Sequence, residues 1–177
     1  DSFENKNQIF YYLKSFFLSK MDHVIVPGSL HKKFIKSFNF KKDIFVTKSV
    51  GIIKPLKKKK YQSKKNKIKI VYIGRVSEEK NLSLLFKLIE SSKSLTLSIY
   101  GKDEINLKSD LNVDLKNKVK FKGSILNKKI KTKIKEYDLL ILPSKFEPWG
   151  LVIEEAIYNG IPVICSDKVG SHKDLIK

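Results

Sequence analysis

Cysteine and histidine are scarce in this sequence of 177 residues. The single cysteine, Cys165, excludes a disulfide within the chain and is typical of proteins from a reducing compartment. The three histidines, His23, His31 and His172, are scattered and form no pattern of metal ligands. We therefore expect no disulfide framework and no metal centre built from these residues.

Long hydrophobic runs are also missing. No stretch approaches the ~20 apolar residues that cross a membrane. The first ten residues, which include Asp1 and Glu4, lack the apolar core of a secretory signal peptide. We expect a cytoplasmic protein, with peripheral contact at the inner face of a membrane left open. Because the sequence does not begin with methionine, we also expect it to be a piece of a longer protein.

Arginine is the third shortage. Lysine and arginine together number 37 and give a formal net charge of +19, yet Arg75 is the only arginine. Proteins that bind nucleic acid use arginine for paired hydrogen bonds to bases and phosphates, so we expect no nucleic-acid partner. Most lysines are expected on solvated faces, with attraction to an anionic membrane around residues 57–67. A non-catalytic basic module that binds nucleic acid or an anionic membrane is the alternative function.

Apolar, strand-like runs alternate with amphipathic, helix-like segments along the chain. This alternation predicts an α/β protein with a parallel, Rossmann-like sheet flanked by helices. A helix is expected over residues 29–38, capped by Ser29. Residues 53–66 are rich in Lys, Gln and Ser, which is the composition of a linker, and they divide the chain into parts 1–52 and 67–177. The expected strands cover residues 23–27, 43–47, 68–74, 95–100 and 119–123, and two more begin at residues 139 and 163.

The segment that follows Pro143 combines the end of a buried strand with the start of a helix. In a parallel sheet, ligands bind at the carboxyl edge of the strands, and a helix start offers free backbone N–H groups to an anion. Glu147 precedes this helix, and Glu155 lies on the helix face that also carries Leu151. Two carboxylates beside backbone donors would suit the hydroxyl groups of a sugar next to a phosphate.

A second motif follows the expected strand 68–74. Gly74 and Arg75 stand at the carboxyl edge of that strand, and Lys80 opens the next helix. Fixed cations in this position can stabilise the negative charge that develops on a phosphate leaving group. The chain has no Gly-x-Gly-x-x-Gly after a strand, which disfavours a dinucleotide-binding protein.

Together, the two motifs resemble those of the family 4 (group 1) retaining glycosyltransferases, which use nucleotide sugars and have the GT-B fold of two Rossmann-like domains. Gly-Arg-x-x-x-x-Lys is similar to the diphosphate clamp of that family. The absence of Asp-x-Asp separates the chain from metal-dependent transferases of the other main fold. The resemblance therefore implies no metal ion and no other cofactor, with the nucleotide sugar as a co-substrate. The acidic signature consists of Glu147, seven intervening residues and Glu155, with Trp149-Gly150-Leu151-Val152 between them and Gly160-Ile-Pro-Val163 after them.

The resemblance implies that residues 1–52 end an acceptor-side domain and that residues 67–177 form a truncated donor-binding domain. The implied activity is transfer of a hexose from a nucleoside diphosphate sugar to a glycan or lipid-linked acceptor in polysaccharide biosynthesis, with retention of configuration. The fragment alone is expected to bind the donor without necessarily being active. Glu147, Arg75 and Lys80 would be catalytic, and the donor would also contact Trp149, Gly150, Leu151 and Glu155.

Overall fold

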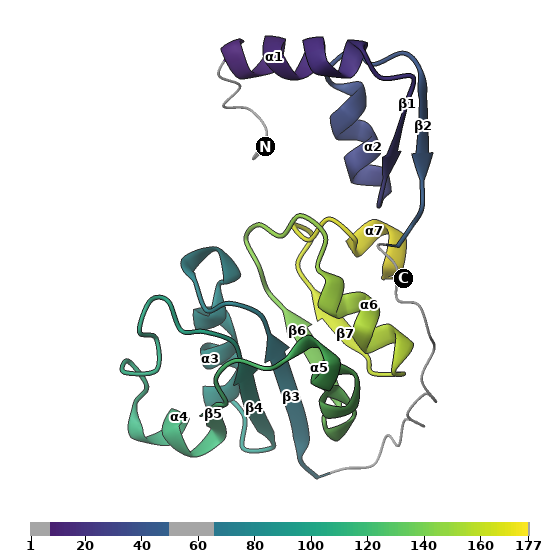
Figure 1. Ribbon diagram of the computed structural model, residues 1–177. Helices are drawn as coiled ribbons and strands as arrows, with labels where there is room; N and C mark the ends of the chain where they lie inside the picture. The colour runs from purple at the N-terminus through teal and green to yellow at the C-terminus, as the bar shows by residue number, and fades with distance from the viewer. Residues whose placement is uncertain (1–7, 50–65, 177) are drawn as a thin grey trace.

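The N-terminal part of the computed structural model is small (Figure 1). The structure describes residues 8–49 and 66–176. Helix α1 (Gln8–Ser19) is followed by strand β1 (His23–Val26), helix α2 (Ser29–Lys36) and strand β2 (Asp43–Val46). β1 and β2 pair in parallel, with His23 opposite Asp43 and Val26 opposite Val46. This pair forms a sheet of its own, separate from the larger sheet of the chain.

The C-terminal part contains a five-stranded sheet in the order β5-β4-β3-β6-β7, in which all neighbouring strands are parallel. The strand order reverses direction between β3 and β6, and such a switch point leaves a crevice at the carboxyl edge. The strands are β3 (Ile68–Ile73), β4 (Leu95–Tyr100), β5 (Val119–Phe121), β6 (Leu139–Leu142) and β7 (Val163–Cys165).

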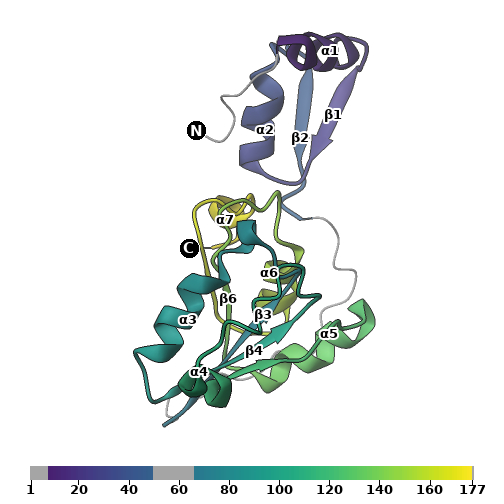
Figure 2. The same cartoon turned by 90° about the vertical axis from the view of Figure 1, so that its left-hand side faces the viewer.

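Helices cover both faces of this sheet. Figure 2 shows α3 and α4 on one face and α5 and α6 on the other. This arrangement follows from right-handed crossovers, which run in one direction before the switch point and in the other direction after it. The helices are α3 (Leu82–Glu90), α4 (Val113–Lys118), α5 (Asn127–Lys133), α6 (Leu151–Tyr158) and α7 (His172–Leu175), with single 3₁₀ turns at η1 (Glu78–Lys80) and η2 (Ile134–Glu136).

The core lies between the sheet and these helices. Ile70, Val71 and Tyr72 of β3 are almost fully buried, as are Leu140 of β6 and Ile153 of α6. Strands buried on both faces read as continuous apolar runs, which is how they were predicted. The α/β class with a parallel sheet is therefore confirmed.

Two details of the sequence-based prediction are wrong. Ser29 does not cap α2: the cap residue is Gly28, which has no side chain to accept a hydrogen bond, and Ser29 is the first helical residue. The prediction also contained no helix at residues 113–118, where the structure has α4. Asn112 caps this helix, because its side-chain oxygen accepts a hydrogen bond from the amide of Leu115. The predicted linker 53–66 lies almost wholly outside the described residues, so the domain boundary stays a prediction.

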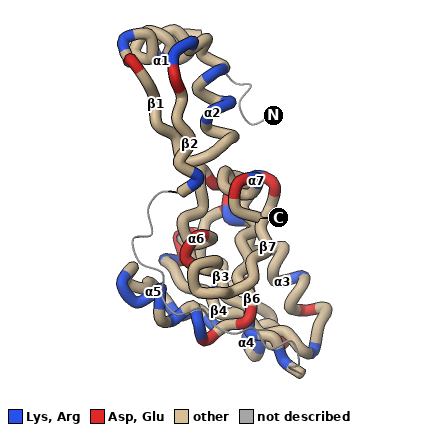
Figure 3. Tube along the Cα trace, turned by 90° about the vertical axis from the view of Figure 1, so that its right-hand side faces the viewer, with Lys and Arg blue, Asp and Glu red and all other residues tan. Residues whose placement is uncertain are grey.

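Charge is distributed unevenly over these elements. Figure 3 shows basic positions on α1, α2, α3 and α5, whereas the charged residues of α6 are Glu154 and Glu155, and α7 carries both Lys173 and Asp174. Among the helices of the described residues, none has the length and apolar character needed to cross a membrane. The lysine-rich segment 57–67, for which membrane attraction was predicted, falls mainly outside the described residues.

Candidate functional site

The two predicted motifs leave adjacent strands at the same edge of the sheet. β3 and β6 are hydrogen-bonded neighbours, and they lead into Gly74 and Pro143, respectively. The loops that follow are bonded to each other, because the amide of Lys145 donates to the carbonyl of Glu79 at 2.7 Å. The amide side chain of Asn81 donates to the carbonyl of Pro143 at 3.3 Å. The Arg75 motif and the Glu147 turn therefore form one structural unit.

An ion pair joins the two motifs directly. The Nζ atom of Lys80 lies 2.9 Å from Oε2 of Glu147, and only 9% of the lysine side chain and 21% of the glutamate side chain are exposed. Lys80 reaches this position because η1 ends at it and Asn81 then adopts the left-handed conformation, with φ of 55°. Breaking a buried pair leaves an unpaired charge, which is costly, so this contact orients both side chains firmly.

Arg75 is held more loosely. Its side chain is 63% exposed and pairs with Glu79 at 3.7 Å and with Glu104 at 3.4 Å. Ion pairs at such exposed positions contribute little to stability, so an incoming anion can replace them at small cost. Arg75 and Lys80 thus lie at the same carboxyl edge of the sheet, as predicted. Lys80 is buried there and Arg75 is open to solvent.

The turn before α6 presents free backbone donors. Gly150 is the cap residue of α6, with φ of 82°, and a Cβ atom there would lie 2.9 Å from Cγ1 of Val169. The amides of Trp149, Gly150 and Leu151 make no hydrogen bond within the described part of the chain. They belong to the three residues for which the family resemblance implies contact with the donor. A helix start with free N–H groups attracts anions, and α6 has that property here.

Trp149 is oriented toward the N-terminal part of the chain. Its side chain is buried, its indole N–H donates to Oε1 of Glu154, and its ring centre lies 5.7 Å from that of His31. Gly28 packs so closely that a Cβ atom there would lie 2.4 Å from the indole ring. The contacts of the Trp149 side chain are therefore those of a packed residue, and its contact with the donor stays a prediction.

Glu155 is buried on α6, apart from the Lys80–Glu147 pair. Only 9% of the residue is exposed, and burial raises the pKa of its carboxyl group, while Lys131 on α5 acts in the opposite direction. The structure records no hydrogen bond or ion pair between Glu155 and the Arg75 motif within the described residues. Among the described residues no Lys or Arg nitrogen lies within ion-pair distance of this carboxylate, so Lys131 acts on it only through its charge.

The sequence patterns did not identify Tyr72 or Glu104 as parts of this site. The Tyr72 hydroxyl donates to the carbonyl of Arg75 at 2.6 Å and so supports the loop from below. Burial raises the pKa of Tyr72, and the nearby negative charge of Glu147 adds to this effect, so the hydroxyl stays protonated. As a buried strand residue, Tyr72 resembles any core tyrosine in sequence, and Glu104 lies 29 residues from its partner.

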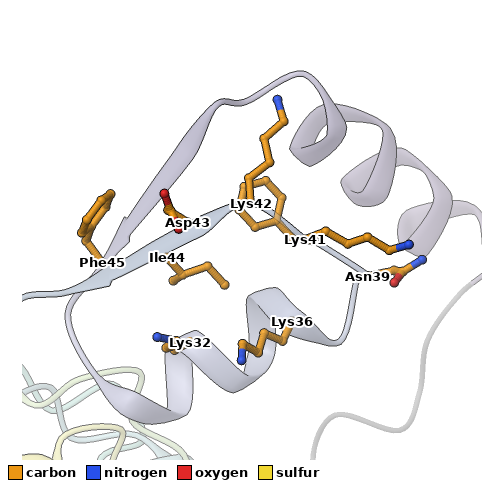
Figure 4. Close-up of a pocket in the computed structure, with 9 residues that line it drawn as sticks. Lys32, Lys36, Asn39, Lys41, Lys42, Asp43, Ile44 and Phe45 are labelled. Atoms are coloured by element: carbon orange, nitrogen blue, oxygen red, sulfur yellow. The ribbon is translucent and has the colours of Figure 1, made fainter.

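A separate cavity lies in the N-terminal part. It has a volume of about 540 Å³ and lies between α2 and β2 (Figure 4). Its lining includes Lys32, Lys36, Lys41 and Lys42 but no residue of the two motifs. The motifs thus meet at the edge of the large sheet and not at this hollow.

Comparison with known proteins identifies the family. The sequence profile for "Glycosyl transferases group 1" matches residues 53–177. The chain belongs to this family. It is 30% identical over 105 residues to an uncharacterized 41.2 kDa protein in the cps region of Klebsiella pneumoniae, covering 58% of this chain and 28% of that protein. It is 29% identical over 114 residues to the uncharacterized glycosyltransferase MJ1607 of Methanocaldococcus jannaschii, covering 61% and 29%.

Solved structures of glycosyltransferases share the fold. The crystal structure of TarM superposes with a TM-score of 0.75 at 19% identity, covering 100% of this chain and 36% of TarM. That of Anabaena Alr3699/HepE in complex with UDP-glucose gives 0.67 at 18% identity, covering 96% and 52%. These neighbours have the GT-B fold, which confirms the predicted fold class for this glycosyltransferase chain. The chain spans under a third of the curated relatives named above.

Proposed function

We propose that the protein to which this chain belongs transfers a hexose from a nucleoside diphosphate sugar to a glycan or lipid-linked acceptor, with retention of configuration. The chain would supply most of the donor-binding half. The observation that carries this proposal is the contact of Lys80 with Glu147 beside Arg75, because it brings cations for a diphosphate and a carboxylate for a sugar to one sheet edge. The structures of HepE with UDP-glucose and of TarM with UDP support the choice of donor class.

The cations would act on the leaving group. As the sugar departs, negative charge builds on the nucleoside diphosphate, and fixed positive charges stabilise that state more than the bound substrate. Arg75 would exchange Glu79 and Glu104 for phosphate oxygens, and Lys80 would add a charge that is already oriented. Each charge-assisted hydrogen bond is worth about 1.5–3 kcal/mol. We expect no metal ion, because these cations and the amides before α6 would meet the phosphate charge.

The carboxylates would recognise the sugar and the ribose. Glu147 has one oxygen committed to Lys80 and retains acceptor capacity for donor sugar hydroxyls. Glu155 would accept hydrogen bonds from the ribose hydroxyls of the nucleotide. Both roles come from the family pattern; in their support, Glu147 follows β6 at the carboxyl edge of the sheet and Glu155 is a buried residue of α6.

Binding experiments test this proposal. A thermal-shift screen of UDP, GDP, ADP and their sugars selects the base, and calorimetry then compares wild type with Lys80→Met and Glu147→Gln. We expect Lys80→Met to weaken the nucleoside diphosphate about tenfold or more. Glu147→Gln should mainly reduce the additional affinity that the sugar provides. Glu136→Gln, an exposed glutamate paired with Lys133 in the same half, is the matched control.

The outcomes separate the enzyme from the alternative. Failure of every nucleotide to stabilise the chain, or identical affinities in wild type, Lys80→Met and Glu147→Gln, would refute the donor-binding role. Steeply salt-dependent DNA or anionic-vesicle binding that Glu147→Gln leaves unchanged would instead support the non-catalytic basic module. Peripheral membrane contact of the full protein stays a prediction, and binding of the full protein to anionic vesicles would test it.

A further inference from the structure

The N-terminus of α2 is capped by a residue from the opposite half of the chain. Asp174, on α7, accepts hydrogen bonds from the amide of Ser29 at 2.8 Å and from its hydroxyl at 3.0 Å. The cap residue Gly28 offers no side chain of its own. A helix start leaves backbone amides without partners and attracts a negative charge, so a carboxylate at this position satisfies both needs. Figure 2 shows α7 next to the N-terminal start of α2.

The loop that leads to α7 is bonded to the turn that carries Glu147. The amide of Glu147 donates to the carbonyl of Lys168 at 3.2 Å, and its carbonyl accepts from the amide of Gly170 at 2.8 Å. The amide of Ser171 donates to the carbonyl of Trp149 at 3.2 Å. A Cβ atom on Gly170 would overlap the carbonyl of Pro148, so the two segments lie in contact. Any shift of α7 would therefore move the Glu147 turn.

A second contact joins the same turn to the N-terminal part. Glu154 accepts from the Trp149 indole with one carboxylate oxygen and from the hydroxyl of Ser49 with the other, at 2.8 Å. Trp149 thus touches both serine–carboxylate contacts. It bonds Glu154, which accepts from Ser49, and it packs against Gly28, which precedes Ser29 and where no side chain would fit. Charge-assisted hydrogen bonds of this kind are stronger than neutral ones and fix geometry.

We propose that Asp174 is a positioning residue of the donor site. Through Ser29 it joins α2 to the loop 168–171, and that loop fixes the orientation of Glu147 relative to the N-terminal part. If the proposed function holds, recognition of the donor sugar depends on the contact between Asp174 and Ser29 of the N-terminal part. The inference rests on the proposed function in this respect. The nucleoside diphosphate would depend on this contact less, because Arg75 and Lys80 would hold it from the loop after β3 and only the amides before α6 belong to the same turn as Glu147.

The first test compares the affinities for UDP-glucose and UDP, or for the nucleotide pair selected by the screen. Ser29→Ala removes one of the two hydrogen bonds, and we expect the sugar contribution to affinity to fall about two- to tenfold. Asp174→Ala removes both and should lower it further, whereas Asp174→Asn keeps an acceptor oxygen and should recover part of the loss. Affinity for UDP alone should fall less than the sugar contribution, because Arg75 and Lys80 would hold the diphosphate from the loop after β3.

Matched controls separate positioning from general damage. Ser37→Ala removes a hydroxyl at the other end of α2, where it bonds only the carbonyl of Phe34. Asp167→Asn removes an exposed carboxylate that pairs with Lys168. Both controls should behave like wild type. If Asp174→Ala and wild type show the same ratio of UDP-glucose to UDP affinity, the positioning role is wrong.

A second measurement does not require nucleotide. Trp149 is the only tryptophan of the chain and is buried between the two parts. Asp174→Ala should shift its fluorescence emission to longer wavelength and increase its quenching by acrylamide, with an unchanged circular dichroism spectrum. Unchanged emission and quenching would overturn the inference. Absence of nucleotide binding by wild type would count against the proposed function instead, and the fluorescence result would still decide the role of Asp174.

Discussion

Two lysine–glutamate pairs in the C-terminal part have nearly the same length and very different surroundings. Lys80 and Glu147 are 2.9 Å apart, with 9% and 21% of their side chains exposed. Lys133 and Glu136 are 2.8 Å apart, with 42% and 57% exposed. If burial makes the Lys80–Glu147 contact important, the two pairs should differ in coupling energy although their geometry is alike.

The size of the difference can be worked out from burial. Removing one partner of a fully buried pair costs about 3–5 kcal/mol, because an unpaired charge remains in a poorly solvated place. Since Glu147 keeps some solvent contact, we expect Lys80→Met to lower the free energy of unfolding by about 2–3 kcal/mol. The double variant Lys80→Met/Glu147→Gln has no buried charge left at this place and should recover at least half of that loss.

Double-mutant cycles measured by urea denaturation test this expectation. The cycle at Lys80 and Glu147 should give a clear coupling energy that depends weakly on salt. The cycle with Lys133→Met and Glu136→Gln should give a much smaller one that salt screens further. A coupling at the exposed pair equal to or larger than that at the buried pair would refute the reasoning.

Three further predictions concern stability. Burial raises the pKa of Glu155, so the folded chain holds that proton more tightly than the unfolded chain, and ionisation costs stability as pH rises through the folded pKa. Glu155→Gln should therefore be more stable than wild type at pH 8, and the gain should vanish below about pH 4, where the carboxyl is protonated in both states; a gain independent of pH would contradict this. Trp149→Phe removes the indole N–H that donates to a buried oxygen of Glu154 and should lower the free energy of unfolding by about 1–3 kcal/mol, so an unchanged urea midpoint would show that this bond is unimportant. Gly150→Ala should lower the free energy of unfolding more than Gly123→Ala does. Both positions have positive φ, but only at Gly150 would the new methyl group lie 2.9 Å from a valine side chain. Equal losses of stability would mean that backbone strain alone decides.

Local pattern was enough to predict the sheet and the meeting of the two motifs. The apolar run 139–142 and the run 68–73 became neighbouring strands, and short loops then had to place Lys80 and Glu147 at one edge. The prediction that Glu147 precedes a helix carrying Leu151 and Glu155 is also confirmed, because α6 begins at Leu151, next to the free amides. These results follow from rules that act over a few residues.

Contacts between distant segments could not be predicted in this way. Ser29 has the chemistry of a helix cap, and the sequence gives no sign that Asp174, 145 residues away, would supply the cap instead. The same holds for Trp149, whose burial depends on Gly28 and His31 in the other part of the chain. Tyr72 and Glu104 were missed because a buried strand residue and an exposed loop acid carry no local mark of a site.

The most direct test of the central claim is a crystal structure of the chain with the nucleotide sugar selected by the screen. The account predicts the diphosphate between Arg75, Lys80 and the amides before α6, with sugar hydroxyls on Glu147. A nucleotide bound elsewhere, such as in the lysine-lined cavity between α2 and β2, with the Lys80–Glu147 pair unchanged, would contradict it.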